Sequence, residues 1–152
     1  MHAATSEADP ACWLVDSSVL CRIVFHESEA ARAWIRSAEA DGDLLFGSRM
    51  LELETGRAVR NRGVWGTVVE IDLLEFLAMF ELVPLTDDLV EAGLALEPPI
   101  GGADAIHVVT AQRLGPEVTT VTHDAQMARA CLALGLPVFD PVTDDPHRPA
   151  VV

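Results

Sequence analysis

Short apolar runs alternate along this chain with longer stretches whose apolar residues recur every three or four positions. The short runs predict strands over residues 12–16, 44–46, 82–85, 118–121 and 137–139. The longer stretches predict helices over residues 17–26, 28–40, 49–61, 66–80, 86–96, 103–114 and 124–135. Strands that alternate with helices are typical of an α/β protein whose parallel sheet is covered on both faces.

The pattern predicts one folded domain over residues 12–140, with an N-terminal tail at 1–11 and a C-terminal tail at 141–152. No apolar run approaches the roughly 18 residues that a membrane span requires. The first residues are polar and acidic and show no signal-peptide pattern. We therefore expect a cytoplasmic protein without a membrane partner.

Charge narrows the candidate functions. The chain has 24 Asp and Glu against 10 Lys and Arg, a formal net charge of −14, which argues against a broad electrostatic nucleic-acid binder. All ten basic residues are arginine, so chemistry that requires a lysine is excluded. The densest basic cluster lies on and after the helix predicted at 49–61; its members are Arg49, Arg57, Arg60 and Arg62.

Acidic residues stand where predicted strands end. Asp16 follows the first apolar run, Asp124 follows the strand predicted at 118–121, and a Pro- and Gly-rich loop delivers Asp104 to a helix. Because parallel strands present their carboxyl ends at one edge, these residues should meet there. Glu54 should join them, since it lies on the inward face of its predicted helix with Leu51.

Each of these acids also has a simpler interpretation. Asp16, Asp104 and Asp124 could cap the helices they precede, and Glu54 could pair with Arg57 on the helix surface. As a set, however, clustered carboxylates repel one another, and a hard divalent cation relieves that repulsion. Such a cation can activate water and neutralise charge on a phosphoryl oxygen.

Other chemistries fit less well. The chain lacks the G-x-S-x-G elbow, the Walker A loop and zinc-type histidine spacing. His107, three residues after Asp104, is better explained as a hydrogen-bonded wall residue than as a metal ligand. A phosphatase or phospho-accepting receiver would need a lysine, and Ser18 occupies the place of the second acid in a phosphatase D-x-D pattern.

Four motifs, taken in order, resemble the PIN-domain ribonucleases, and among these the VapC-type toxins of bacterial toxin–antitoxin pairs. They are Asp16-Ser17-Ser18, Glu54-Thr55-Gly56-Arg57-Ala58, Asp104-Ala105-Ile106-His107 and Thr122-His123-Asp124. The resemblance covers residues 12 to about 140. It implies a PIN-like three-layer α/β/α fold around a central parallel sheet of about five strands.

The resemblance also implies site residues. The catalytic acids would be Asp16, Glu54, Asp104 and Asp124, with Asp16, Asp104 and Asp124 as ligands of Mg²⁺ or Mn²⁺. Ser18 and Thr122 match hydroxyl positions that border the pocket. VapC toxins cut tRNA or ribosomal RNA, are held inactive by a cognate antitoxin, and usually form homodimers.

From the residues themselves, Arg57 and Arg60 are candidates for holding RNA phosphates beside these acids. The resulting hypothesis is a metal-dependent endoribonuclease toxin. The alternative is a non-enzymatic binding module whose acidic pocket captures a basic peptide partner. Binding of a divalent cation would favour the first hypothesis, and its absence the second.

Overall fold

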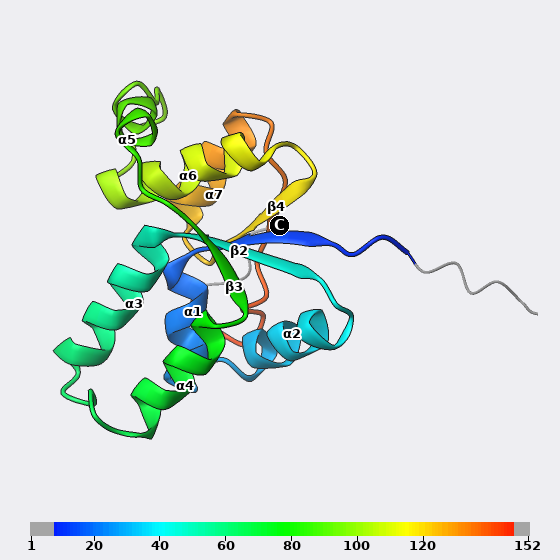
Figure 1. Ribbon diagram of the computed structural model, residues 1–152. Coiled ribbons are helices and arrows are strands. Elements are labelled where there is room, and N and C mark those ends of the chain that lie inside the picture. Colours follow the sequence, from blue (N-terminus) through cyan, green and yellow to red (C-terminus); the bar gives the residue numbers. More distant parts are fainter. Residues whose placement is uncertain (1–7, 148–152) are drawn as a thin grey trace, which may run out of the picture.

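A parallel sheet forms the centre of the protein, in the strand order β3-β2-β1-β4-β5 (Figure 1). The computed structural model describes residues 8–147. Within them the strands are β1 (Cys12–Val15), β2 (Leu44–Ser48), β3 (Phe80–Val83), β4 (Val118–Val121) and β5 (Val138–Phe139). The order places β1 at the centre between β2 and β4, so the end of β1 opens at the middle of the sheet edge.

Helices cover both faces of the sheet, as the alternating pattern predicts. They are α1 (Ser17–Val24), α2 (Glu29–Ala40), α3 (Arg49–Asn61), α4 (Val68–Leu77), α5 (Asp87–Leu94), α6 (Gly102–Leu114) and α7 (Ala125–Ala133). In Figure 1, α1 to α4 lie on one side and α6 and α7 on the other, with α5 packed against α6. None of the helices in residues 8–147 is both long and apolar enough to cross a membrane.

Two apolar layers hold this arrangement together. The larger layer joins the sheet to α1, α2, α3 and α4 around Ile23, Ile35 and Phe76. The smaller one joins the other face to α6 and α7 around Leu14 and Met127. Burial of apolar surface on both faces is what commits this chain to a three-layer α/β/α fold.

Side-chain caps fix where most helices begin. In six of the seven described helices an oxygen of the residue before the helix accepts a backbone N–H of the first turn. These capping residues are Asp16, Ser28, Ser48, Thr67, Thr86 and Asp124. The helix α6 is the exception, because its capping position is Gly101 and receives no side-chain hydrogen bond.

Two details differ from the sequence-based expectation. The third strand is Phe80–Val83 rather than 82–85, because Phe80 is buried against the sheet and Pro84 cannot donate a ladder hydrogen bond. The apolar pattern of the predicted helix 49–61 also predicts that Leu53 faces inward with Leu51, which is wrong, since Leu53 is 55% exposed. Leu53 lies on the open side of α3.

The chain beyond β5 packs against the domain as far as it is described. Val142 is buried in the larger apolar layer. Asp144 accepts hydrogen bonds from the Ser28 hydroxyl at 2.6 Å and from the backbone N–H of Ala30 at 3.3 Å, at the start of α2. Residues 141–147 therefore make specific contacts, although the sequence suggested only a tail.

Candidate active site at the carboxyl edge of the sheet

Asp16 lies at the centre of the sheet edge, directly after β1, and its side chain is buried. Oδ1 accepts the Ser18 hydroxyl at 2.6 Å and the backbone N–H of Val19 at 3.3 Å. Oδ2 accepts the Thr122 hydroxyl at 2.6 Å. The two hydroxyl residues expected beside the pocket therefore both contact Asp16, one from each side.

Burial raises the pKa of Asp16 above its ordinary value, because removal from water disfavours the charged form. The nearby His107 and the hydrogen bonds from Ser18 and Thr122 act in the opposite direction without reversing the shift. Asp16 is thus an acid whose negative charge the fold only partly compensates.

Asp124 follows β4, the strand beside β1, and is partly buried. Its Oδ1 caps α7 by accepting the backbone N–H groups of Gln126 at 2.8 Å and Met127 at 3.0 Å. Its own N–H donates to Thr122 Oγ1 at 3.0 Å. Capping thus explains one oxygen of Asp124, and the side chain is oriented by the helix that it caps.

Asp104 is in the first turn of α6 and does not cap it, because Gly101 occupies the capping position. Its carboxylate makes no hydrogen bond or ion pair with the described residues. Burial, followed by the negative charges of Asp124 and Asp16, raises the pKa of Asp104 above its ordinary value. The charges of these acids therefore act on one another at this edge.

Glu54 reaches the same edge from α3 and does not pair with Arg57, which instead donates to Asn61. Glu54 Oε1 lies 2.7 Å from His107 Nε2 and accepts the Ser17 hydroxyl at 3.0 Å. Burial opposes ionisation of Glu54, but the hydrogen bond and charge of His107 and the bond from Ser17 lower its pKa overall.

His107 is the wall residue that the sequence suggested. Its ring is fully buried, with Nδ1 3.1 Å from the Ser48 hydroxyl and Nε2 against Glu54. It thereby connects α6 to α3 across the site. The spacing of His107 from Asp104 indicated this position, but nothing local in the sequence indicated its partners Ser48 and Glu54.

The donor set at this edge suits a hard divalent cation. Four carboxylates supply only oxygen ligands, and that of Asp104 has no hydrogen-bonding partner among residues 8–147. As the side chains stand, no three His, Cys, Asp or Glu residues in this part of the chain converge closely enough to form a complete cation site. Repulsion between uncompensated carboxylates favours such an open arrangement, and a cation would relieve it.

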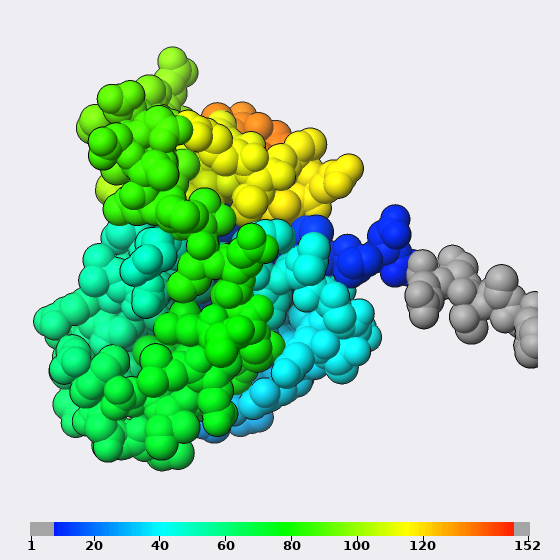
Figure 2. Space-filling model, viewed as in Figure 1, coloured from blue at the N-terminus to red at the C-terminus, as the bar shows by residue number. Residues whose placement is uncertain are grey.

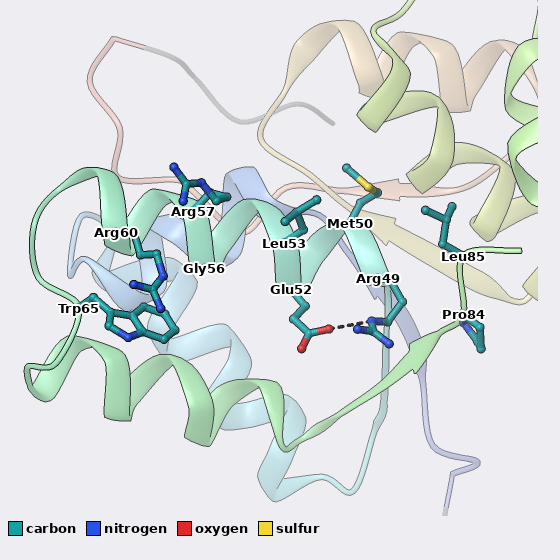
Figure 3. Close-up of a pocket in the computed structure, with 10 residues that line it drawn as sticks. All are labelled: Arg49, Met50, Glu52, Leu53, Gly56, Arg57, Arg60, Trp65, Pro84 and Leu85. Carbon is teal, nitrogen blue, oxygen red and sulfur yellow. Dashed lines mark ion pairs between the residues drawn. The ribbon is translucent and has the colours of Figure 1, made fainter.

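A groove of about 620 Å³ lies along the open side of α3, the helix that carries Glu54 (Figure 3). Arg57 and Arg60 line it, and the Arg60 guanidinium stacks 3.9 Å above the Trp65 ring. Leu53 and Leu85 supply apolar surface. In Figure 2 the surface of α3 (blue-green) borders that of α4 and β3 (green) on this side of the molecule.

The other two arginines of the basic cluster, Arg49 and Arg62, each form an ion pair with a glutamate. Arg62 pairs with Glu27 at 2.6 Å and does not line the groove, whereas Arg49 lines it but pairs with Glu52 at 2.7 Å. Arg57 and Arg60 are therefore the groove arginines without an acidic partner among the described residues.

The sequence did not indicate the contacts that His123 makes with two aspartates near the site. His123, between Thr122 and Asp124, lies with Nδ1 2.7 Å from Asp140 Oδ2 and Nε2 3.1 Å from Asp145 Oδ2. Asp140 directly follows β5, so the strand-end rule that selected Asp16 would also have selected it.

A parallel sheet with carboxylates gathered at its carboxyl edge is the arrangement found in PIN domains. The sequence profile described as "PIN domain" matches residues 13–132, and the chain belongs to this family. PIN domains are nucleases, which generally use a divalent metal ion. No curated protein matches the chain.

Solved structures resemble this fold closely. DNA-bound VapBC from Salmonella typhimurium gives a TM-score of 0.69 at 12% identity, covering 86% of this chain and 98% of that chain. VapBC2 from Rickettsia felis, bound to a promoter DNA fragment, gives 0.66 at 12% identity, over 85% and 98%. FitAcB from Neisseria gonorrhoeae gives 0.59 at 20% identity, over 85% and 97%. At these identities the likeness establishes the fold.

Proposed function

We propose that this protein is a Mg²⁺- or Mn²⁺-dependent endoribonuclease, a VapC-type toxin that a cognate antitoxin neutralises. The observation that carries the proposal is the gathering of four carboxylates, from distant parts of the chain, at one edge of a PIN-domain sheet. Burial and, after it, the negative charges of Asp124 and Asp16 raise the pKa of Asp104, which supports the grouping of these three acids.

The acids have different roles in this proposal. Asp16, Asp104 and Asp124 would hold the cation, and Glu54 would contact it directly or through water. A bound cation would lower the pKa of a water molecule and neutralise charge on the scissile phosphate. Ser18 and Thr122 orient both oxygens of Asp16. Despite its burial, the hydrogen bond and charge of His107 and the bond from Ser17 lower the pKa of Glu54, which favours the ionised form that a cation binds.

The groove along α3 supports a polymeric substrate. Arg57 and Arg60 present guanidinium groups that can bind phosphates on either side of the cleaved bond. Arg57 lies one turn after Glu54 and Arg60 about one turn further on, so both arginines belong to the helix that carries one of the acids. We take the substrate to be RNA of the tRNA or ribosomal class on the strength of the resemblance.

The partners follow from the same proposal. The neighbours named above include VapBC complexes, and by analogy a cognate antitoxin would bind this chain. Exposed Leu53 and Leu85 beside the groove arginines offer apolar and basic contacts to such a protein. We also propose a homodimer and a cytoplasmic location, where RNA substrate is available.

The test compares wild type with Asp16→Asn, which keeps the size of the side chain and removes its charge. We expect wild type to bind Mn²⁺ in calorimetric titrations and to cleave RNA. Asp16→Asn should lose both properties while its circular dichroism spectrum is unchanged. Asp41→Asn, the same chemical change on the exposed end of α2, is the matched control and should behave as wild type.

Two results would contradict the proposal. If Asp16→Asn still cleaved RNA, Asp16 would not be a catalytic residue. Absence of Mn²⁺ and Mg²⁺ binding by wild type would leave the acids as helix caps and wall residues, and would favour the acidic pocket as a binding module for a basic peptide.

A further inference from the structure

The His123 side chain is held from both ring nitrogens, and we call this group of His123, Asp140 and Asp145 the His123 clamp. Nδ1 lies 2.7 Å from Asp140 Oδ2, and Nε2 lies 3.1 Å from Asp145 Oδ2. The ring and the Asp140 carboxylate are buried. A ring held at both nitrogens can neither turn about its Cβ–Cγ bond nor shift sideways without losing a hydrogen bond.

The clamp acts on the short turn that carries two residues of the candidate site. Thr122 donates to Asp16 Oδ2, and Asp124 follows one residue after His123. The backbone N–H of His123 donates to Ser18 Oγ at 3.0 Å, and Ser18 in turn donates to Asp16. The turn 122–124 is therefore fixed on one side by Ser18 and on the other by the clamp.

The two carboxylates of the clamp are themselves anchored. Asp140 Oδ1 accepts the backbone N–H of Val142 at 2.9 Å, and Val142 is buried in the larger apolar layer. Asp145 Oδ2 also lies 3.5 Å from a guanidinium nitrogen of Arg22 on α1. The clamp therefore links the turn to the apolar core through Asp140 and to α1 through Asp145.

We propose that Asp140 and Asp145 are positioning residues, which hold the turn 122–124 so that Asp124 and Thr122 face Asp16. This inference rests on the proposed function and extends the working part of the protein to residue 145. A displacement of about 1 Å in a group that binds a reacting centre can cost about 100-fold in rate. Residues that orient metal ligands are worth about 10–100-fold in metal affinity or activity.

The test removes the contacts one at a time in the full chain. We expect Asp140→Ala to weaken Mn²⁺ binding, measured by calorimetry, by about 10-fold or more. The kcat for RNA cleavage should fall similarly, while KM stays near the wild-type value because the groove arginines are on α3. Asp140→Asn, which keeps an oxygen near His123, should recover part of the lost metal affinity.

Asp144→Ala is the matched control. Asp144 lies in the same segment but binds Ser28 and Ala30 of α2, so its removal lowers stability without touching the clamp. We expect this control to keep wild-type Mn²⁺ affinity and kcat. If Asp140→Ala does not fold, Asp145→Ala decides the question, since the Asp145 side chain is only partly buried.

The outcomes separate the two proposals. Wild-type Mn²⁺ affinity and kcat in a folded Asp140→Ala or Asp145→Ala variant would overturn the positioning role and leave the nuclease proposal intact. Equal losses in Asp140→Ala and Asp144→Ala would reduce the clamp to a general stability effect and overturn the inference as well. A wild type that binds no divalent cation would instead overturn the nuclease proposal, and the inference with it.

Discussion

At the scale of the residue, Asp16 shows a conflict between folding and function. Its carboxylate is buried at the centre of the sheet edge and has a raised pKa. Hydrogen bonds from Ser18, Thr122 and Val19 offset only part of the cost of its charge. We therefore expect Asp16 to stabilise the fold less than a neutral side chain of the same shape would.

This conflict predicts a pH-dependent gain in stability for Asp16→Asn. Well below the unfolded-state pKa of about 3.9, Asp16 is protonated in both the folded and the unfolded chain, so its charge makes no difference. As pH rises from that value to the raised folded-state pKa, the unfolded chain releases the proton while the folded chain keeps it, and the wild type loses stability relative to the variant. The difference then becomes constant above the folded-state pKa.

The measurement is urea unfolding of both proteins between pH 4 and pH 8 without divalent cations. Asp41→Asn serves again as the exposed control, because no burial acts on that position. A difference between Asp16→Asn and wild type that is the same at every pH would contradict the expectation.

Sequence reasoning located single residues well where a simple rule applied. The ends of strands pointed to Asp16 and Asp124, since a parallel sheet fixes where such residues lie. Capping was an open alternative for Asp16, Asp104 and Asp124 alike, and the sequence could not show that only Asp104 does not cap, because that depends on where α6 begins. Pairings between distant elements, such as His107 with Glu54, have no local signature.

At the scale of the element, the junction between β2 and α3 is packed without spare room. A Cβ placed on Gly47 would lie 2.5 Å from Leu51 Cδ2 and 3.3 Å from both Leu51 Cβ and Leu82 Cδ2. Leu51 is fully buried, so its side chain has nowhere to move. This close approach sets α3 against the sheet and so fixes the position of Glu54.

Two glycine substitutions should therefore have opposite effects on stability. Gly47→Ala should destabilise the protein by about 1–3 kcal/mol through overpacking. Gly56→Ala should stabilise it by about 0.5–1 kcal/mol, because Gly56 is inside α3 and a Cβ there meets no atom within 4 Å. Thermal and urea unfolding of the two variants measures both changes in stability. A loss of stability in both variants would contradict the packing argument.

The elements themselves were largely predictable. The range 49–61 was right for α3 because Ser48 supplies a cap and Gly63 a terminator after it. The third strand was misplaced because Phe80 continued the apolar spacing of the preceding helix. Its burial against Leu45 of β2 is a tertiary contact that outweighs this local pattern.

At the scale of the whole molecule, charge is distributed unevenly. The net charge of −14 repels a polyanion, while the groove along α3 carries arginines without acidic partners among the described residues. Under the proposed function, attraction to RNA would therefore come from a small area. Binding of this kind weakens as salt rises, because each phosphate contact releases counterions.

Arg57→Ala should raise KM several-fold and leave kcat nearly unchanged. It should also reduce the slope of log binding constant against log salt by about 1, as expected for one lost phosphate contact. Arg36→Ala removes the same charge from the exposed side of α2 and should change neither quantity. Equal effects of the two substitutions would show that only total charge matters.

The position of β4 beside the central strand β1 has a consequence for the synthesis of the protein. A ribosome that has translated the chain as far as α6 has already produced Asp16, Glu54 and Asp104, but not the turn that completes their surroundings. Asp16 gains Thr122 only when β4 inserts next to β1. Under the proposed function, the surroundings of Asp16 are therefore complete only after β4 and the turn that follows it have been translated.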